Sequence, residues 1–200
     1  MREILSAVSG AIFTLAFIPY IRAIWRTRHL PPKTPGKAEP SKTSWIIWVS
    51  LDTIALAGMY VERAQNYQIL SAVVLGWVVV FLAIKYGTSE WTRFDKINLS
   101  GAMLGVALWY VFRNATIAIV ISMAVVFTGS FTTFEKAWKH PENEDKLAWF
   151  LFWLSCLPMM AAIPEWTLAS ATQPVTYLVI ESIMIYLLFW QPRKPCEVVK

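Results

Sequence analysis

Long stretches without a charged side chain run through almost the whole of this 200-residue chain. Five uncharged stretches cover residues 4–21, 64–84, 97–112, 114–134 and 147–164, and two more, 44–61 and 174–190, contain a single acid each. A helix needs roughly 17–25 mostly apolar residues to cross the hydrocarbon core of a bilayer. Hydrophobic residues make up 56% of the chain, which leaves little for a soluble domain. The sequence therefore predicts an all-α membrane protein with seven transmembrane helices.

The chain also repeats itself. Trp45 and Tyr86 lie 41 positions apart, and so do Trp149 and Trp190. Each pair encloses an apolar segment, a short polar break and a second apolar segment. Ahead of each pair, another apolar segment ends in a similar phrase, IRAIW in the first copy and FEKAW in the second. An internal repeat of this size in an apolar chain is typical of transporters built from two helical bundles around a central site.

Each repeat contains three predicted spans, and a seventh span lies between the repeats. The predicted spans cover about residues 4–25, 44–61 and 68–86 in the first repeat (1–88), 97–112 in the linker (89–113), and 115–133, 146–163 and 174–190 in the second repeat (114–192), which a tail (193–200) follows. Three spans reverse the direction of the chain, so one linker helix restores a common orientation. We therefore expect two parallel three-helix bundles joined by an inverting linker helix.

Basic residues fall mostly on one side of these spans. Of the 18 Lys and Arg residues, only Arg2, Arg63 and Arg113 lie on the other side. Because cytoplasmic loops carry the excess of Lys and Arg, this distribution predicts an outside N-terminus and a cytoplasmic C-terminus in a plasma or inner membrane. The net charge of +5 then reflects loops that set topology and contact lipid headgroups. We expect the lipid bilayer, and no nucleic acid, as a partner.

Two acids, Asp52 and Glu181, lie deep in predicted spans. A carboxylate at this depth is costly unless it is neutral, paired or hydrated, and such acids are functional by default. Trp45, Trp48 and Asp52 follow one another at helical spacing and therefore share a face. We expect Asp52 and Glu181 to make polar or proton-linked contacts with a solute. The alternative is a structural role, in which a protonated acid holds two helices together.

Tryptophans at comparable depth extend this predicted site. In the second repeat Trp153 and Cys156 share a face, and an offset of 104 residues maps Asp52 onto Cys156. Together with Trp48 and Trp77, they are predicted to line a pocket that stacks a solute between rings and orients it with a few polar groups. The alternative is the interfacial belt, where Trp is enriched. We expect that belt to hold the tryptophans nearer the surfaces: Trp25, Trp45, Trp109, Trp138, Trp149, Trp166 and Trp190.

Two prolines interrupt predicted spans, Pro19 near the cytoplasmic end of 4–25 and Pro158 in the middle of 146–163. Each proline removes one backbone hydrogen bond and crowds a preceding carbonyl, so each predicts a kink. We expect Pro19, the neighbouring Tyr20 and Pro158 to serve as hinges or gates. Static kinks are the alternative.

The amino-acid sequence around Pro19 resembles that of a known protein family. Residues 17–27 read FIPYIRAIWRT, a basic loop follows, and Ser44 opens the next span. Together with the predicted arrangement of three, one and three transmembrane helices, this sequence resembles the PQ-loop superfamily. That superfamily includes SWEET sugar transporters and lysosomal amino-acid exporters. PnuC-type vitamin transporters have a related fold. The chain departs from the Pro-Gln pair of that family at Tyr20, and again at Thr132 and Thr133 in the second repeat.

The resemblance also implies where a solute would bind. In SWEET-type proteins, tryptophans on the second and sixth spans and polar residues on the third and seventh spans line the sugar site. Trp48, Trp153 and Glu181 resemble that arrangement. Trp77, which maps onto Glu181 by the same offset of 104, departs from it and favours a flatter or aromatic solute.

These features predict a transporter that moves a small polar solute (a sugar, a vitamin or nucleoside, or an amino acid) by alternating access around a midplane site. The alternatives are a non-transporting membrane receptor and a structural or assembly subunit of the same fold. The sequence has no phosphate-cradling glycine loop, no metal-ligand spacing and no catalytic set typical of soluble enzymes. We therefore expect no enzymatic activity, no cofactor and no metal, and the sequence leaves a homo-oligomer open.

Overall fold

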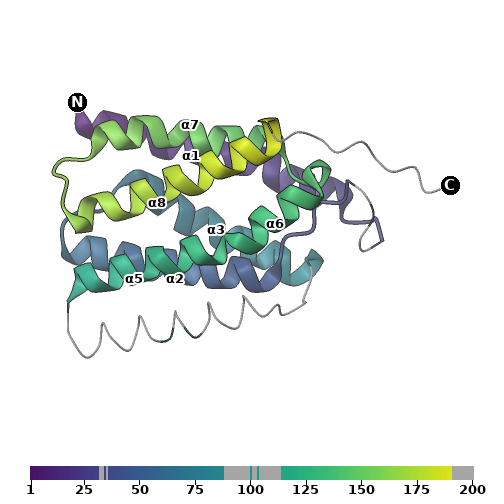
Figure 1. Ribbon diagram of the computed structural model, residues 1–200, viewed down its shortest axis with the longest axis horizontal. Helices are drawn as coiled ribbons and strands as arrows, with labels where there is room; N and C mark the ends of the chain where they lie inside the picture. The colour runs from purple at the N-terminus through teal and green to yellow at the C-terminus, as the bar shows by residue number, and fades with distance from the viewer. Residues whose placement is uncertain (32–33, 35, 88–99, 101–102, 104–113, 191–200) are drawn as a thin grey trace.

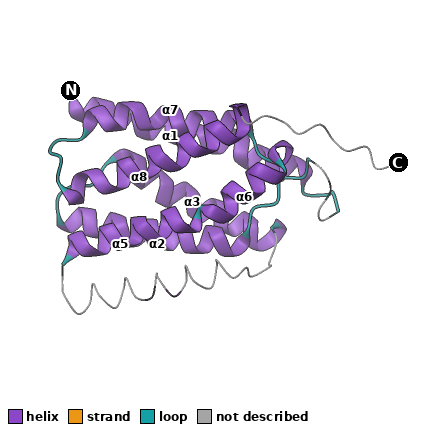
Figure 2. Ribbon diagram, viewed as in Figure 1, coloured by secondary structure: helices purple, strands orange, loops and turns teal. Residues whose placement is uncertain are grey.

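The computed structural model describes residues 1–31, 34, 36–87, 100, 103 and 114–190 (Figure 1). Over these residues the chain forms helices and loops, with no strand (Figure 2). The helices are α1(Arg2–Thr27), α2(Lys42–Val61), α3(Tyr67–Tyr86), α5(Ala115–Gly129), α6(Phe131–Lys139), a 3-10 turn η1(Pro141–Asn143), α7(Lys146–Ala162), α8(Leu168–Ile185) and a π-helical turn η2(Tyr186–Trp190). The predicted linker helix at 97–112, apart from Ser100 and Met103, and the tail at 193–200 lie outside the described residues.

Five helical segments of the described chain are long and apolar enough to cross a membrane. They are α1, α2, α3, the α5–α6 segment (Ala115–Lys139) and the α8–η2 segment (Leu168–Trp190). The helix α7 is also apolar but, at 17 residues, slightly shorter. Large apolar side chains such as Leu15, Val74, Phe81 and Leu157 are exposed on the surface of the protein. Helices that are apolar all round are those of a membrane-embedded protein.

Short polar side chains determine where most helices begin. Each accepts a hydrogen bond from the backbone N–H three residues later, which satisfies a donor that the first helical turn leaves unpaired. The capping residues are Ser41 before α2, Asn66 before α3, Asn114 before α5, Asp145 before α7 and Thr167 before α8. Thr167 starts α8 at Leu168, six residues before the predicted start at 174, so Pro174 lies inside the helix.

The fifth predicted span is longer than expected and is divided. The helix α5 ends at Gly129, and α6 continues from Phe131 to Lys139, past the predicted end at 133. At the break, the Ser130 hydroxyl donates to the carbonyl oxygen of Val126 at 2.9 Å. A side-chain bond of this kind competes with the helical ladder and often accompanies a bend.

The six long helices form a closed ring. The helix α1 packs against α3 and α7, α2 packs against α3 and α5, and α8 packs against α5 and α7. Going round the ring, the order is therefore α1, α3, α2, α5, α8 and α7. The start of α5 lies at the same end as the N-terminus (Figure 1). Each helix thus has two neighbours, and a space at the centre is reached by side chains from all six.

Close contacts in this ring depend on glycine. A Cβ atom on Gly10 of α1 would lie 2.7–2.9 Å from the Cβ, O and C atoms of Tyr67, at the start of α3. A Cβ atom on Gly76 of α3 would lie 2.6 Å from a methyl group of Val49 on α2. Small residues allow helices in membranes to approach closely, which increases van der Waals contact between them.

Candidate functional site

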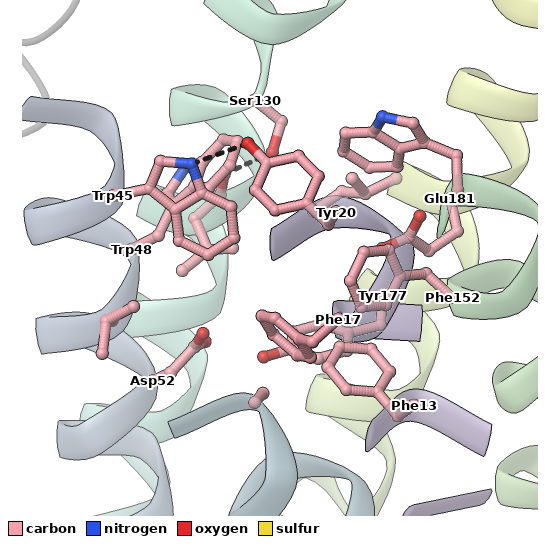
Figure 3. A pocket seen from close by; sticks show the side chains of 15 residues that line it. Phe13, Phe17, Tyr20, Trp45, Trp48, Asp52, Ser130, Phe152, Tyr177 and Glu181 are labelled. Atoms are coloured by element: carbon pink, nitrogen blue, oxygen red, sulfur yellow. Dashed lines mark hydrogen bonds between the residues drawn. The ribbon is translucent and has the colours of Figure 1, made fainter. Parts of the chain in front are cut away.

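A cavity of about 80 Å³ lies at the centre of the ring (Figure 3). All six long helices contribute to its wall. The lining residues are Phe13, Phe17 and Tyr20 on α1; Trp45, Trp48, Val49 and Asp52 on α2; Ala72 on α3; Val126 on α5 and Ser130 at its end; Trp149 and Phe152 on α7; and Tyr177, Ile180 and Glu181 on α8.

Aromatic rings form most of this wall, and they touch one another. Phe13 stacks on Tyr177 with ring centroids 5.8 Å apart, and it lies 4.7 Å from Phe152 by the same measure. Phe17 meets Phe152 edge to face at 5.0 Å and approaches Trp45 at 6.4 Å. Such edge-to-face and offset pairs are favourable geometries for aromatic rings. The wall is therefore well packed rather than loosely assembled.

Two carboxyl groups interrupt the aromatic wall. Asp52 and Glu181 are each 7% exposed, and they reach the cavity from α2 and α8 (Figure 3). Asp52 Oδ1 and Glu181 Oε2 are buried without a hydrogen-bond partner, and so is the indole Nε1 of Trp48. The Tyr177 hydroxyl interacts with the Asp52 carboxyl. Buried polar atoms in native proteins are nearly always satisfied, so these three atoms are free hydrogen-bonding positions of the cavity wall.

The offsets of the predicted repeats relate several of the lining residues to one another. On α2 and α7 the offset of 104 relates Trp45 to Trp149 and Trp48 to Phe152, and all four residues line the cavity. On α1 and α5, an offset of 113 aligns the IRAIW phrase with the FEKAW phrase. The same offset relates two further pairs of lining residues, Phe13 with Val126 and Phe17 with Ser130.

Indole hydrogen bonds lie at the end of the cavity nearest the loops that precede α2 and α7. The Trp45 Nε1 atom donates to the Tyr20 hydroxyl at 3.2 Å (Figure 3), and the Trp149 Nε1 atom donates to Glu144 Oε2 at 2.9 Å. Glu144 belongs to the loop before α7 and is partly buried. Burial raises the pKa of its carboxyl above the ordinary value, while the hydrogen bond from Trp149 and the charge of Lys136 act in the opposite direction.

A row of side-chain hydrogen bonds lies on the other side of the cavity. Asn66 Nδ2 donates to Gln173 Oε1 at 2.8 Å, Gln173 Nε2 donates to Gln68 Oε1 at 3.1 Å, and Gln68 Nε2 donates to Ser155 Oγ at 2.9 Å. We refer to these four residues as the amide chain. Gln68, Gln173 and Ser155 are completely buried. Hydrogen bonds that run in one donor-to-acceptor direction polarise and strengthen one another.

A second, larger cavity of about 810 Å³ adjoins the amide chain. Its lining includes Arg2, Glu3 and Arg63 as well as Asn66, the first residue of the amide chain. At its other end, the amide chain reaches the cavity wall, because the Ser155 hydroxyl donates to the carbonyl oxygen of Phe152 at 2.6 Å. The amide chain therefore lies between the larger cavity and the central one.

The residues predicted for the site separate into two groups. Asp52, Glu181, Trp48 and Tyr20 line the central cavity. Cys156, Trp77 and Trp153 do not. Cys156 is buried beside the amide chain, where Gln68 Nε2 lies 3.5 Å from its Sγ atom. Trp77 is 44% exposed on the outside of α3, and its Nε1 atom donates to Thr53 Oγ1. Trp153 donates to Ser182 Oγ at 3.2 Å, away from the cavity.

The two prolines occupy the helix interiors predicted for them. Pro19 lies inside α1, directly before the cavity residue Tyr20, and Pro158 lies inside α7, two residues after Cys156. A proline at each position leaves the carbonyl four residues earlier without its helical donor. Both sites are therefore weak points in helices that line the cavity.

Several cavity residues were not anticipated from the sequence. Trp45 and Trp149 were expected in the interfacial belt, whereas the structure places both in the cavity wall. The repeat offset of 104 relates these two residues and was a usable signal for them. Tyr177 and the glutamines of the amide chain gave no such signal, because their roles depend on contacts between distant helices.

No protein-family model, curated protein or solved structure matches the chain. Within the described residues, no three His, Cys, Asp or Glu side chains are grouped in a way that could hold a metal ion. The chemistry of the cavity therefore has to be inferred from its own residues: two acids, one free indole donor and a wall of rings.

Proposed function

We propose that this chain is a membrane transporter that moves a small polar solute by alternating access around the central cavity. The observation that carries the proposal is the set of three buried, unsatisfied polar atoms on Asp52, Glu181 and Trp48, all at the central cavity. Polar groups buried without partners cost free energy, and a bound solute removes that cost. Acids inside a membrane bundle commonly mark a solute or ion pathway.

The packing of the helices supports the repeat-based architecture that alternating access requires. The contacts of α1 with α3 have their counterpart in α5 with α8, those of α2 with α3 in α7 with α8, and those of α1 with α7 in α5 with α2. Such a pattern is expected for two parallel three-helix bundles related by an axis along the membrane normal, with the linker helix between them. The N-terminus outside and the C-terminus in the cytoplasm complete the proposed topology.

Layers on both sides of the cavity support a gating mechanism. The Tyr20–Trp45 bond joins α1 to α2 on the side of the basic loops, and the amide chain joins α3, α7 and α8 on the other side. In alternating access, one side opens while the other stays closed, so two separate closures are needed. In this proposal, these hydrogen bonds between helices hold each side shut in turn.

The proposal agrees with the resemblance of the segment around Pro19 to PQ-loop proteins, and membership of that superfamily is part of it. The cavity wall also supports solute binding, because its two acids are set among aromatic rings.

Flux measurements on the purified protein test this function. The protein would be reconstituted into liposomes, and uptake of radiolabelled sugars, nucleosides, vitamins, amino acids and amines would be followed for wild type and for Asp52→Asn. We expect saturable uptake of one solute class by wild type and at least tenfold slower uptake by Asp52→Asn. The matched control is Glu165→Gln, an exposed acid in the loop between α7 and α8, with unchanged uptake.

Binding without flux would favour a receptor instead, since a receptor needs the site but not the gates. If neither binding nor flux is seen and both Asp52→Asn and Glu181→Gln only lower stability, the chain is a structural or assembly subunit.

A further inference from the structure

We propose that the solute of the central cavity is a small organic cation. This inference rests on the transport function proposed above and names its substrate class. It is carried by four properties of the cavity: its charge, its aromatic wall, its hydrogen-bonding groups and its size.

The charged groups at the cavity are all acidic. Asp52 and Glu181 line it, and no described lysine, arginine or histidine does. Among the residues described, neither acid forms an ion pair. A buried carboxylate is tolerated when an opposite charge or hydrogen bonds compensate it. A cationic solute supplies that charge, whereas an anionic solute would add repulsion.

The aromatic wall favours the same class. Eight of the fifteen lining residues carry aromatic rings: Phe13, Phe17, Tyr20, Trp45, Trp48, Trp149, Phe152 and Tyr177. The faces of such rings carry negative electrostatic potential, and they attract ammonium groups even when these are fully methylated. The rings and the two acids therefore act on a cation in the same direction.

The hydrogen-bonding groups of the wall argue against a solute with many hydroxyls. The Tyr20 hydroxyl already accepts from Trp45, the Trp149 indole donates to Glu144, and Ser130 donates to a backbone carbonyl. Apart from oxygens of the two acids, the indole Nε1 of Trp48 is the one buried polar side-chain atom of the described lining without a hydrogen-bond partner. A sugar has more hydroxyl oxygens than the wall has free buried N–H donors, while a cation with a single oxygen matches the one indole.

The cavity is small, with a volume of about 80 Å³, and therefore favours a small cation. Tetramethylammonium and choline are suitable probes of this class, and the hydroxyl oxygen of choline is an acceptor for the indole of Trp48. The neutral alcohol 3,3-dimethylbutan-1-ol has nearly the same shape as choline and lacks its charge.

The test measures binding and flux separately, on the full chain. Calorimetric titration would give the affinities for choline, tetramethylammonium and 3,3-dimethylbutan-1-ol in detergent, and labelled choline would be followed into liposomes. We expect choline to bind at least tenfold more tightly than the neutral alcohol. Asp52→Asn and Glu181→Gln should each weaken choline binding at least tenfold, and Glu165→Gln should leave it unchanged.

The outcomes separate this inference from the transport function. Equal affinity for choline and 3,3-dimethylbutan-1-ol, or binding of neither cation, would overturn the organic cation. If a neutral solute is carried while both cations fail to bind, transport stands and the cation is overturned. If choline binds, and both acid variants weaken its binding, but it is not carried into liposomes, the cation site stands and the transport function is overturned.

Discussion

Asp52 on α2 and Glu181 on α8 face one cavity, and each has one buried carboxyl oxygen without a hydrogen-bond partner. The two residues come from different predicted repeats and are 129 positions apart in the chain. Neither helix could form this cavity wall alone. In the proposed function both acids bind the solute, and the alternative is that they hold the bundle together.

The first prediction concerns the stability of the ligand-free protein. Asp52→Asn and Glu181→Gln keep the shape of each side chain but remove a buried acid that lacks full compensation. We expect the melting temperature in detergent to stay equal or to rise, with the free energy of unfolding changed by less than about 1 kcal/mol. Tryptophan fluorescence during heating measures this. A loss of several degrees in both variants would assign the acids a structural role.

The second prediction concerns the amide chain. Gln68→Met keeps the volume but removes the acceptor of the Gln173 Nε2 group and the donor to Ser155 Oγ, so we expect a loss of about 2 kcal/mol of stability. In Gln68→Met/Gln173→Met, the Gln173 Nε2 group and the Gln68 Oε1 atom, each of which one single variant leaves without its hydrogen bond, are both removed. The double variant should therefore be less destabilised than the sum of the two single variants, by about 1 kcal/mol in a double-mutant cycle. Additive losses would mean that the two glutamines are not coupled.

The third prediction concerns the contact between α1 and α3. In Gly10→Ala the new methyl group would meet backbone atoms of Tyr67, which cannot turn aside. We expect a loss of about 1–3 kcal/mol from this overpacking. In Gly76→Ala the methyl group would meet only a side-chain methyl of Val49, so the loss should be smaller. Thermal unfolding of both variants gives the comparison, and equal losses would contradict the argument.

The fourth prediction concerns pH. Because burial raises the pKa of the Glu144 carboxyl above its ordinary value of 4.5, the folded protein favours its protonated form. This contribution to stability is complete below pH 4.5 and is lost as the pH rises through the raised pKa. The Glu144→Gln variant does not titrate and can still accept from Trp149. We therefore expect its melting temperature, relative to wild type, to increase as the pH is raised from 4.5.

The matched control for this experiment is Glu165→Gln, at an exposed position of the loop between α7 and α8. It should show the pH dependence of wild type. If the difference between Glu144→Gln and wild type is the same at every pH, the carboxyl of Glu144 does not titrate differently in the folded and unfolded states.

The fifth prediction concerns the hinge at Pro19. Pro19→Ala restores a helical hydrogen bond to the carbonyl of Leu15 and straightens α1. If the kink serves gating, the maximal flux should change several-fold while the affinity for the solute stays the same. Pro164→Ala, in the loop before α8, is the control and should leave both values unchanged. An unchanged flux in Pro19→Ala would show that the kink is static.

The positions of several helices in the chain could be predicted from hydropathy. The starts and ends of α2, α3 and α7 fall within two residues of the predicted spans, because a capping residue or a charge bounds each apolar stretch. The start of α8 could not be predicted in this way. Residues 168–173 are too polar to look like a membrane span, and Pro174 resembled a first helical residue, while Thr167 caps the helix earlier.

The site was only partly predictable, for a physical reason. Depth in a span follows from position in the sequence, so Asp52 and Glu181 could be recognised as costly acids. The rotation of each helix about its axis follows from packing against its neighbours. A side chain one position along the helix can therefore face away from the cavity wall. Trp77 and Trp153 lie at suitable depths but face elsewhere, while Trp45 and Trp149 face the cavity.

The ring is nearly symmetric, but its acids are not. The position that matches Asp52 in the second repeat is Cys156, and the position that matches Glu181 in the first is Trp77. A homodimer of one repeat would carry either two aspartates or two glutamates, related by its two-fold axis. Joining both copies in one polypeptide allows each to mutate independently. The cavity wall carries an aspartate on α2 and a glutamate on α8, so under the proposed function an asymmetric solute has a preferred orientation inside it.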